Sequence, residues 1–229
     1  MNAKQLVTAQ SLYDVVKSHR VVDHPWFKNE LKTGKAKPGR VQAMTKQLIV
    51  YYDNIIQLYG PMYMNNADYK VRRLFVDKML KPIKLNGTKL RLGEGAHAEL
   101  ARQLARAVGV SANVAKNPKA SALVAERIDR MIATLERPQY WVTLGACAAA
   151  ENQMKGLHTA MAKALKTHYK VKDKHLKVFK APMLFNRKDL DRALGMCTDE
   201  FDQLRIQYYT ERFRDEWYDL WDAVFTSGR

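Results

Sequence analysis

The sequence contains few of the residues that interrupt helices or cross-link small folds. Only 11 glycines and 7 prolines occur among 229 residues, whereas methionine occurs 10 times. This balance favours a helical protein over one built of strands and tight turns. The two cysteines, Cys147 and Cys197, do not make a disulfide framework in a chain of this length. We therefore expect a protein of a reducing, cytoplasmic environment.

Long apolar runs are also missing. No stretch of 18 apolar residues occurs, so the sequence predicts no membrane-spanning helix. The opening residues, MNAKQLVTAQSLYDVV, are amphipathic and lack the apolar core of a secretory signal peptide. Neither a membrane span nor a secretory leader is therefore expected.

Acidic residues are scarce relative to basic ones. Thirty-nine Lys and Arg stand against 23 Asp and Glu, which gives a formal net charge of +16. Such a charge raises the question of a nucleic-acid partner. However, basic residues recur along most of the chain, with denser stretches at 28–46 and 163–188, and no zinc-finger, RNA-recognition or basic-zipper signature occurs. Solvated helix faces, or a pocket for an anionic ligand, account better for the charge, and nucleic-acid binding is a less favoured alternative.

Apolar residues recur with the 3.6-residue period of a helix throughout the chain. The pattern predicts helices near residues 3–19, 38–59, 67–81, 94–109, 119–136, 139–168, 182–195 and 198–225. The intervening segments, including 81–89, are read as loops because they hold Gly, Pro and Asn. No linker separates two domains, so the prediction is one all-α domain over 1–229, a bundle of about seven or eight helices.

The predicted helix 139–168 carries two ionisable residues on its apolar face. Leu144, Cys147, Glu151, Met154 and His158 follow one another at steps of three and four, which places them on one core-facing stripe. An ionised carboxylate is very costly to bury without a partner. Glu151 should therefore be protonated, paired with a Lys or Arg, bound to a metal, or exposed to a wet pocket, and His158 is either part of that site or a hydrogen-bonded core imidazole.

Two further helices repeat this pattern. His97 shares a stripe with Leu100 and Leu104, and Glu94 lies three residues before it on nearly the same side. Asp189 and Arg192 lie on a partly apolar stripe, where they either contribute to a site or pair with each other at i, i+3.

Three other features admit a functional and a structural interpretation. His24, in VVDHPWF, is either a site residue or a cap at a helix entry. Cys147 is interpreted as a small apolar side chain rather than a catalytic thiol. The Tyr51–Tyr52 pair is interpreted mainly as core, with a wall for a flat ligand as the alternative.

Several stretches, in order, resemble the heme-oxygenase-like superfamily, which includes the pyrroloquinoline-quinone synthase (PqqC-like) family, the TenA thiaminases and the CADD-like diiron oxidases. The stretches are HPWF, YYDNIIQLYGPMYMNNADYKVRRLFVDKML, HAELARQLARAVGV, Glu-x6-His at 151 and 158, and RFRDEWYDLWDAV. The resemblance covers nearly the whole chain and is strongest to the PqqC-like branch.

The PqqC-like resemblance implies a metal-free oxidase that acts on a small substrate with O2. Glu151, His158 and His24 would be catalytic residues. Lys180 and Arg214 stand where that family has Arg and Lys, and would bind substrate. The resemblance also implies substrate-binding roles for Tyr52 and Asp53, and it implies a homodimer. The sequence departs from the family where Pro82 replaces a pocket His, and where Ile49 and Asp53 replace an Arg and a Gln.

The diiron branch implies a different site. His97, Glu151 and Asp189 match three of its six ligand positions, and Glu94 could supply another ligand, which would give a weak or mononuclear iron site. The remaining positions hold residues that do not serve as iron ligands, Leu90, Phe185 and Arg192. In the TenA pattern Cys147 falls near the catalytic Cys, but Glu151 occupies the Tyr position.

The favoured hypothesis is therefore a PqqC-like biosynthetic oxidase or oxygenase whose small substrate, anionic or carbonyl-bearing, is held between helices. The alternatives are an iron-dependent oxidase of the same fold and a non-catalytic binding protein on a former enzyme scaffold.

Overall fold

A computed structural model of the chain is built almost entirely of helices. It describes residues 7–64, 69, 72, 73, 76, 77, 82–85, 88–91, 95–137, 139–154, 156–181, 187–197 and 199–228. The main helices are α1 (Ala9–Lys17), α2 (Pro38–Asp53), α3 (Ile55–Met64), α5 (Ala96–Ala107), α6 (Ala112–Lys116), α7 (Ala122–Leu135), α8 (Tyr140–Met154), α9 (Leu157–Tyr169), α10 (Arg187–Leu194) and α11 (Glu200–Thr226). Short helical turns are η1 (Val21–Asp23), η2 (Phe27–Leu31), η4 (Asp173–His175) and η5 (Lys177–Lys180).

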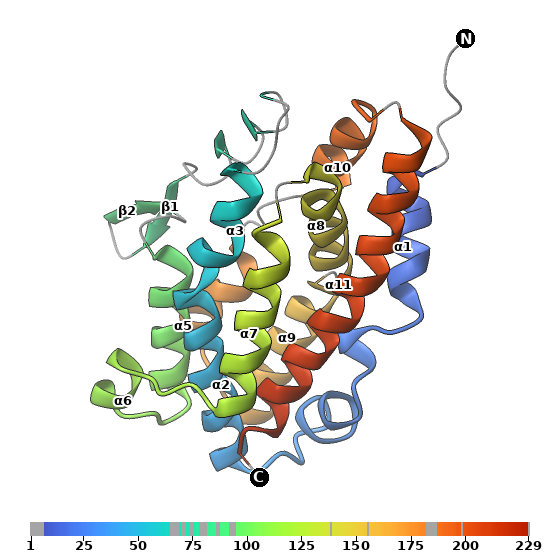
Figure 1. Cartoon of the computed structure of the whole chain (residues 1–229). Coiled ribbons are helices and arrows are strands. Elements are labelled where there is room, and N and C mark those ends of the chain that lie inside the picture. Colours follow the sequence, from blue (N-terminus) through green and yellow to red (C-terminus); the bar gives the residue numbers. More distant parts are fainter. Residues whose placement is uncertain are drawn as a thin grey trace.

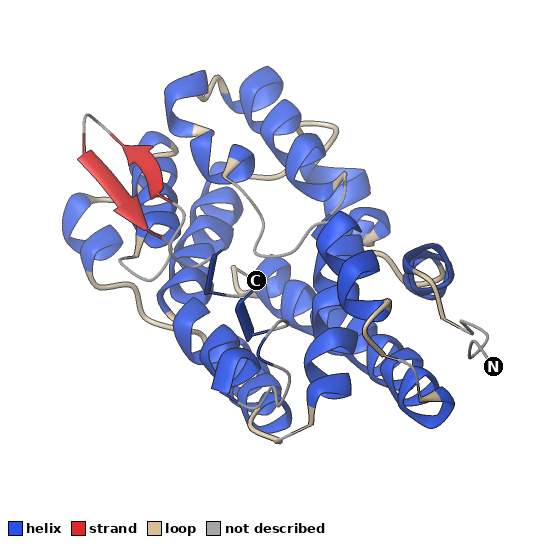
Figure 2. Ribbon diagram, turned by 90° about the horizontal axis from the view of Figure 1, so that it is seen from above, coloured by secondary structure: helices blue, strands red, loops and turns tan. Residues whose placement is uncertain are grey.

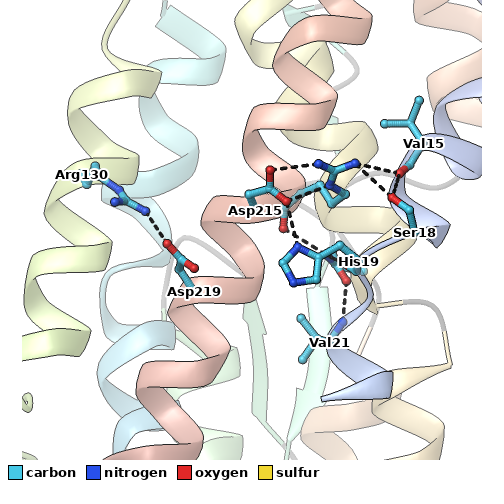
Figure 3. Close-up of polar contacts among 9 residues, drawn as sticks. Val15, Ser18, His19, Val21, Arg130, Asp215 and Asp219 are labelled. Atoms are coloured by element: carbon cyan, nitrogen blue, oxygen red, sulfur yellow. Dashed lines mark hydrogen bonds and ion pairs between the residues drawn. The ribbon is translucent and has the colours of Figure 1, made fainter. Parts of the chain in front are cut away.

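The long helix α11 organises the bundle. It runs beside α1 (Figure 1) and packs most extensively against α8, with further contacts to α7 and α2. Helices α2 and α5 form the second extensive pair. Helix α7 is linked to α11 by an ion pair between Arg130 and Asp219 at 2.9 Å (Figure 3). Buried apolar side chains from α1 to α11 form one contiguous core.

The run of small residues in α8 permits its close contact with α11. Gly145 faces Tyr209 and Thr210, and a Cβ added at position 145 would lie 2.6 Å from the Cβ of Tyr209. Such a distance is well inside van der Waals contact, so only glycine fits at this crossing. The alanines that follow, Ala146 and Ala148 to Ala150, are buried as well.

Serine, threonine and aspartate side chains begin several helices. The Thr8 hydroxyl accepts a hydrogen bond from the backbone N–H of Ser11 at 3.1 Å in a capping box that starts α1. Ser121 caps α7 by accepting from the N–H of Val124 at 3.3 Å. Asp199 caps α11 in the same way.

The segment predicted as one helix over 139–168 is two helices. Helix α8 ends at Met154 and α9 begins at Leu157, and the intervening Gly156 has φ 82°. This left-handed conformation cannot continue a right-handed helix, and glycine adopts it without steric cost. The prediction of an unbroken stripe from Glu151 to His158 was therefore wrong.

A β-hairpin replaces the loop predicted at 81–89. Strands β1 (Pro82–Leu85) and β2 (Thr88–Arg91) pair antiparallel, with Ile83 opposite Leu90. The hairpin lies at one side of the helices (Figure 2). The helix predicted at 67–81 falls largely outside the described residues.

A buried glutamine ties three segments together near the end of α8. Gln153 is fully buried, and its side-chain oxygen accepts from the N–H of Val21 at 2.9 Å. Its NH2 donates to the carbonyls of His19 at 2.8 Å and Arg214 at 3.1 Å. This amide is thus fully used, and it fixes α8 against η1 and α11.

Within the described part of the chain, no helix combines the length and the apolar character needed to cross a membrane.

Candidate functional site

Glu151 lines a cavity of about 520 Å³ between α1, α8 and α10. This volume lies within the range typical of small-molecule sites. The cavity is lined by Ala9, Tyr13, Glu151, Asn152, Arg187, Lys188 and Leu190.

The position of Glu151 follows from the apolar stripe of α8. Leu144, Cys147 and Met154 on this stripe are buried, whereas Glu151 is only half-buried. Glu151 thus lines a cavity, which is one of the environments that the sequence allowed for this carboxylate. Its neighbour Asn152 is fixed by a hydrogen bond from its amide nitrogen to the carbonyl of Ala148 at 2.8 Å.

Two cations of α10 share the cavity with Glu151. Arg187 and Lys188 begin this helix and are exposed. A carboxylate and two cations around one cavity give a site of mixed charge with a net positive balance. Such a site is suited to hold an organic anion beside a proton-transferring carboxylate.

Cys147 lies one turn before Glu151 but has the character of a core residue. Burial, together with the negative charge of Glu151, raises the pKa of the Cys147 thiol far above its ordinary value. Because the thiolate is the nucleophilic form, this thiol is inert at neutral pH. The structure thus favours the interpretation of Cys147 as a small apolar side chain.

His158 lies in a second cluster, with His97, Tyr52 and Phe179. The rings of His158 and Phe179 have centroids 5.6 Å apart, and those of Tyr52 and His97 lie 5.5 Å apart in a stacked arrangement. Burial, and then the charge of His97, lowers the pKa of His158 to about 4. His158 is therefore neutral at physiological pH, and its Nε2 is buried without a hydrogen-bond partner in the described part of the chain.

Glu151 and His158 thus lie in different parts of the structure, Glu151 at the cavity and His158 in the cluster with Phe179. His158 is not among the described residues that line the Glu151 cavity. The break at Gly156 explains the difference, because it gives α9 a direction independent of α8. The acid and the imidazole that looked paired in sequence belong to two clusters.

His24 has both ring nitrogens engaged in the fold. Its Nδ1 accepts from the backbone N–H of Trp26 at 3.2 Å, so its Nε2 carries the proton and donates to Asp222 of α11 at 3.0 Å. The ring is buried and lies near Phe225. In this arrangement His24 acts as a local cap and as a link between η1 and α11.

Arg214 links α11 to α1 and is not among the described residues that line the cavity. Its guanidinium binds both carboxylate oxygens of Asp215, at 2.8 and 2.9 Å, and also donates to the carbonyl of Val15 and the hydroxyl of Ser18. The hydrogen bond to Asp215 raises the pKa of Arg214 and lowers that of Asp215. Asp215 in turn lies 2.9 Å from Nδ1 of His19.

The other predicted substrate-binding residues are dispersed. Lys180 is exposed at the end of η5, and Asp53 forms a surface ion pair with Arg102 at 2.7 Å. Tyr52 is buried beside His97. Among the described residues that line the Glu151 cavity, Lys180, Arg214, Tyr52 and Asp53 do not occur.

The predicted iron ligands do not assemble either. In the described part of the chain, no three His, Cys, Asp or Glu side chains gather closely enough to hold a metal ion. His97, Glu151 and Asp189 therefore do not form a three-ligand site. Glu94 and Phe185 lie outside the described residues.

Sequence reasoning missed Tyr13, Arg187 and Lys188 as cavity residues. Tyr13 is a half-buried residue of an amphipathic helix, and the two cations belong to one of the dense basic stretches. No local pattern marks them, because only the packing of α1 and α10 onto α8 brings them to Glu151.

Comparison with known proteins supports the fold. No protein-family profile matches the sequence, and no curated protein is significantly similar to it. Among solved structures, a domain of unknown function with a heme oxygenase-like fold from Shewanella denitrificans OS217 aligns with a TM-score of 0.70. The alignment covers 94% of this chain and 89% of that chain at 15% identity. The chain therefore has a heme oxygenase-like, all-α fold, as predicted, and at this identity the likeness concerns the fold alone.

Proposed function

We propose that this protein binds a small organic anion in the cavity between α1, α8 and α10, and that Glu151 transfers a proton to or from the bound molecule. The observation that carries the proposal is the half-buried carboxylate of Glu151 in a cavity that it shares with Arg187 and Lys188. A structural ion pair alone would not require a cavity of about 520 Å³.

The roles of the lining residues follow from their chemistry. Arg187 offers a planar pair of donors for a carboxylate, and Lys188 adds a second positive charge. Leu190 and Ala9 supply apolar contacts for the carbon skeleton of the ligand. Once the anionic group is held by α10, Glu151 of α8 faces the remainder of the molecule and serves as general base or acid.

More specifically, we propose that the protein is an O2-dependent oxidase. A substrate that loses a proton to Glu151 becomes an electron-rich anion, which transfers two electrons to O2. The products are the oxidised substrate and hydrogen peroxide, which takes one proton back from Glu151 and the second from the substrate or from solvent. This form is supported by the PqqC-like resemblance of the sequence, and it does not require His24 or His158 at the cavity.

Ligand-observed NMR tests the binding step. Pyruvate, benzoate and glutamate serve as probes for a keto acid, an aromatic carboxylate and an amino acid. We expect saturable binding of at least one probe, weakened about tenfold or more in an Arg187→Gln/Lys188→Gln double variant, because each charge-assisted contact contributes on the order of 1.5–3 kcal/mol. Lys28→Gln/Lys35→Gln removes the same charge from exposed positions outside the cavity lining and should leave binding unchanged. Equal weakening in both double variants would show that only net charge matters.

Glu151→Gln tests the catalytic step. Glutamine keeps the shape of the side chain but removes the repulsion of a bound anion, so we expect equal or tighter binding. O2 uptake and peroxide formation with a turned-over substrate should fall by about 10²-fold or more, the usual size of a general acid–base contribution. Unchanged turnover in this variant would remove Glu151 from the mechanism.

The same measurements separate the alternatives. A binding protein without activity would show the Arg187 and Lys188 effect but no O2 uptake with any bound probe. An iron-dependent oxidase would retain stoichiometric iron after anaerobic loading and lose it in Glu151→Ala. Because no three His, Cys, Asp or Glu ligands gather in the described part of the chain, we expect the wild type to bind no stoichiometric iron.

The homodimer implied by the family resemblance remains a prediction. Size-exclusion chromatography with light scattering checks it against the chain mass of 26.4 kDa.

A further inference from the structure

A second cavity lies on another part of the molecule, where α5 meets η4. Its volume is about 480 Å³. It is lined by Glu99, Gln103, Arg106, Ala107, Lys174 and His175. Helices α5 and η4 are in direct contact, so one wall comes from a regular helix and the other from the basic segment after α9. The residues of this cavity have no part in the function proposed for Glu151.

Positive charge dominates this cavity. Arg106 and Lys174 are exposed, and Lys172 lies close enough to His175 to influence the charge of its ring. The carboxylate in the lining, Glu99, pairs with Arg106 at 3.2 Å. Two cations of the lining, Arg106 and Lys174, therefore stand against one carboxylate, and Lys172 lies near them. A bound anion would relieve the repulsion among these cations.

His175 adds a neutral donor to the cations. Burial, followed by the charges of Lys174, Lys172 and Arg106, lowers the pKa of His175, so the ring is uncharged at neutral pH. Its Nδ1 is buried without a hydrogen-bond partner in the described chain. Since a buried N–H without an acceptor is rarer than an under-satisfied acceptor, the proton belongs on Nε2. The ring thus has an N–H to offer to a ligand in the cavity that it lines.

Cations near the end of α5 also offset the negative end of that helix dipole. That structural role accounts for the presence of Arg106. It does not account for the concave opening, for the amide of Gln103 at its wall, or for the uncharged imidazole among cations. Together these groups present a guanidinium fork, an ammonium, an amide and an imidazole N–H.

We propose that the cavity formed by Arg106, Gln103, Lys174 and His175 binds the phosphate group of a small phosphorylated molecule. Phosphate offers several strong acceptor oxygens, which match the bidentate geometry of Arg106 and the point charge of Lys174. A dianionic or more highly charged group is favoured over a single carboxylate because Arg106 and Lys174 line the cavity and Lys172 lies near them. The concave shape suits a compact ligand that enters the opening.

Isothermal titration calorimetry with inorganic pyrophosphate tests this site, with sodium chloride adjusted to constant ionic strength. We expect a saturable single site. Lys174→Gln should weaken it about tenfold, the loss of one charge-assisted contact. Lys174 is exposed, so this variant should fold normally. Arg106→Gln should weaken binding at least as much.

The matched control is Lys17→Gln, which removes the same charge from the exposed face of α1. Equal affinities of the wild type and the Lys174 variant, or equal weakening in the Lys17 variant, would overturn the site. A second readout is the NMR titration of His175, which is flanked by Arg106, Lys172, Lys174 and Glu99. Bound pyrophosphate should raise its titration midpoint, whereas an unmoved midpoint would place the anion elsewhere.

A nucleic-acid phosphate backbone is the rival ligand. Tight, salt-dependent binding of a single-stranded oligonucleotide without any pyrophosphate binding would overturn the small-molecule proposal. Pyrophosphate binding that depends on Lys174 would support it, provided that the oligonucleotide binds only weakly and that its binding does not depend on Lys174.

Discussion

The α-carbon of Gly145 in α8 lies so close to Thr210 in α11 that an added Cβ would be 2.9 Å from the Thr210 nitrogen. The obstructing atoms include backbone, which cannot rotate away as a flexible side chain does. This approach fixes the distance between the two helices that share the most extensive contact in the fold.

Gly145→Ala should therefore destabilise the protein by about 1–3 kcal/mol, because the methyl group forces the helices apart. Urea denaturation measures this change in the free energy of unfolding. Gly39→Ala is the matched control, since Gly39 also lies in a helix, α2, and a methyl group there would meet nothing within 4 Å. The control should be neutral or more stable by about 0.5–1 kcal/mol. Equal effects of the two substitutions would contradict the tight crossing.

The depressed pKa of His158 predicts a dependence of stability on pH. The unfolded chain takes up a proton near the ordinary value of 6.5, whereas the folded ring resists protonation down to about 4. Stability is therefore unaffected above pH 6.5, falls as the pH drops from 6.5 towards 4, and changes no further below that value. The loss amounts to roughly 1–3 kcal/mol.

Urea denaturation at about pH 7 and about pH 4.5 measures this loss, and His158→Leu supplies the comparison. The variant should lose less stability than the wild type over that interval because it has no ring to protonate. NMR should also place the His158 titration midpoint near pH 4. A midpoint near 6.5 would show that the imidazole is not held in an apolar cluster.

Arg214→Lys should lower the free energy of unfolding by about 1 kcal/mol, because lysine cannot bind both oxygens of Asp215. Binding of a probe in the Glu151 cavity should stay within about twofold of the wild-type value, since Arg214 lies between α11 and α1. Thermal denaturation and ligand-observed NMR give the two readouts. A large loss of binding with unchanged stability would restore the substrate-binding role that the sequence predicted for Arg214.

Neither thiol should react in the folded protein. Burial raises the pKa of both Cys147 and Cys197, so little thiolate forms at about pH 8. A colorimetric thiol reagent should detect two thiols per chain in guanidinium and almost none without it. Rapid labelling of Cys147 in the native state would indicate that Glu151 and its surroundings are more open than the structure shows.

The helical period was sufficient to predict the class of fold and many inward faces. Leu100 and Leu104 share the buried face of α5 with His97, as predicted from their spacing. The β-hairpin was missed, although its two strands flank Asn86-Gly87, a dipeptide typical of tight hairpin turns. Each strand has only four residues, so its alternation of apolar and polar side chains was too short to outweigh the surrounding helical pattern.

The candidate site was predicted only in part. Glu151 was identified because an acid on an apolar stripe requires a special environment. Its cavity partners could not be found, because Arg187 is distant in sequence and its position depends on how α10 packs. His24 and Arg214 were assigned to the site by resemblance, whereas their hydrogen bonds show side chains engaged within the fold.

Gly156 also changes how the Glu-x6-His motif can be used to compare proteins. In a continuous helix seven residues correspond to about 10 Å of axial rise, so the motif would define a fixed separation and direction. Across a residue with φ 82°, the same interval defines neither. Two chains that share the motif but differ in a glycine at this place need not share a site. Substitutions on α8 that affect the surroundings of Glu151 can accordingly occur independently of substitutions on α9 that affect the surroundings of His158.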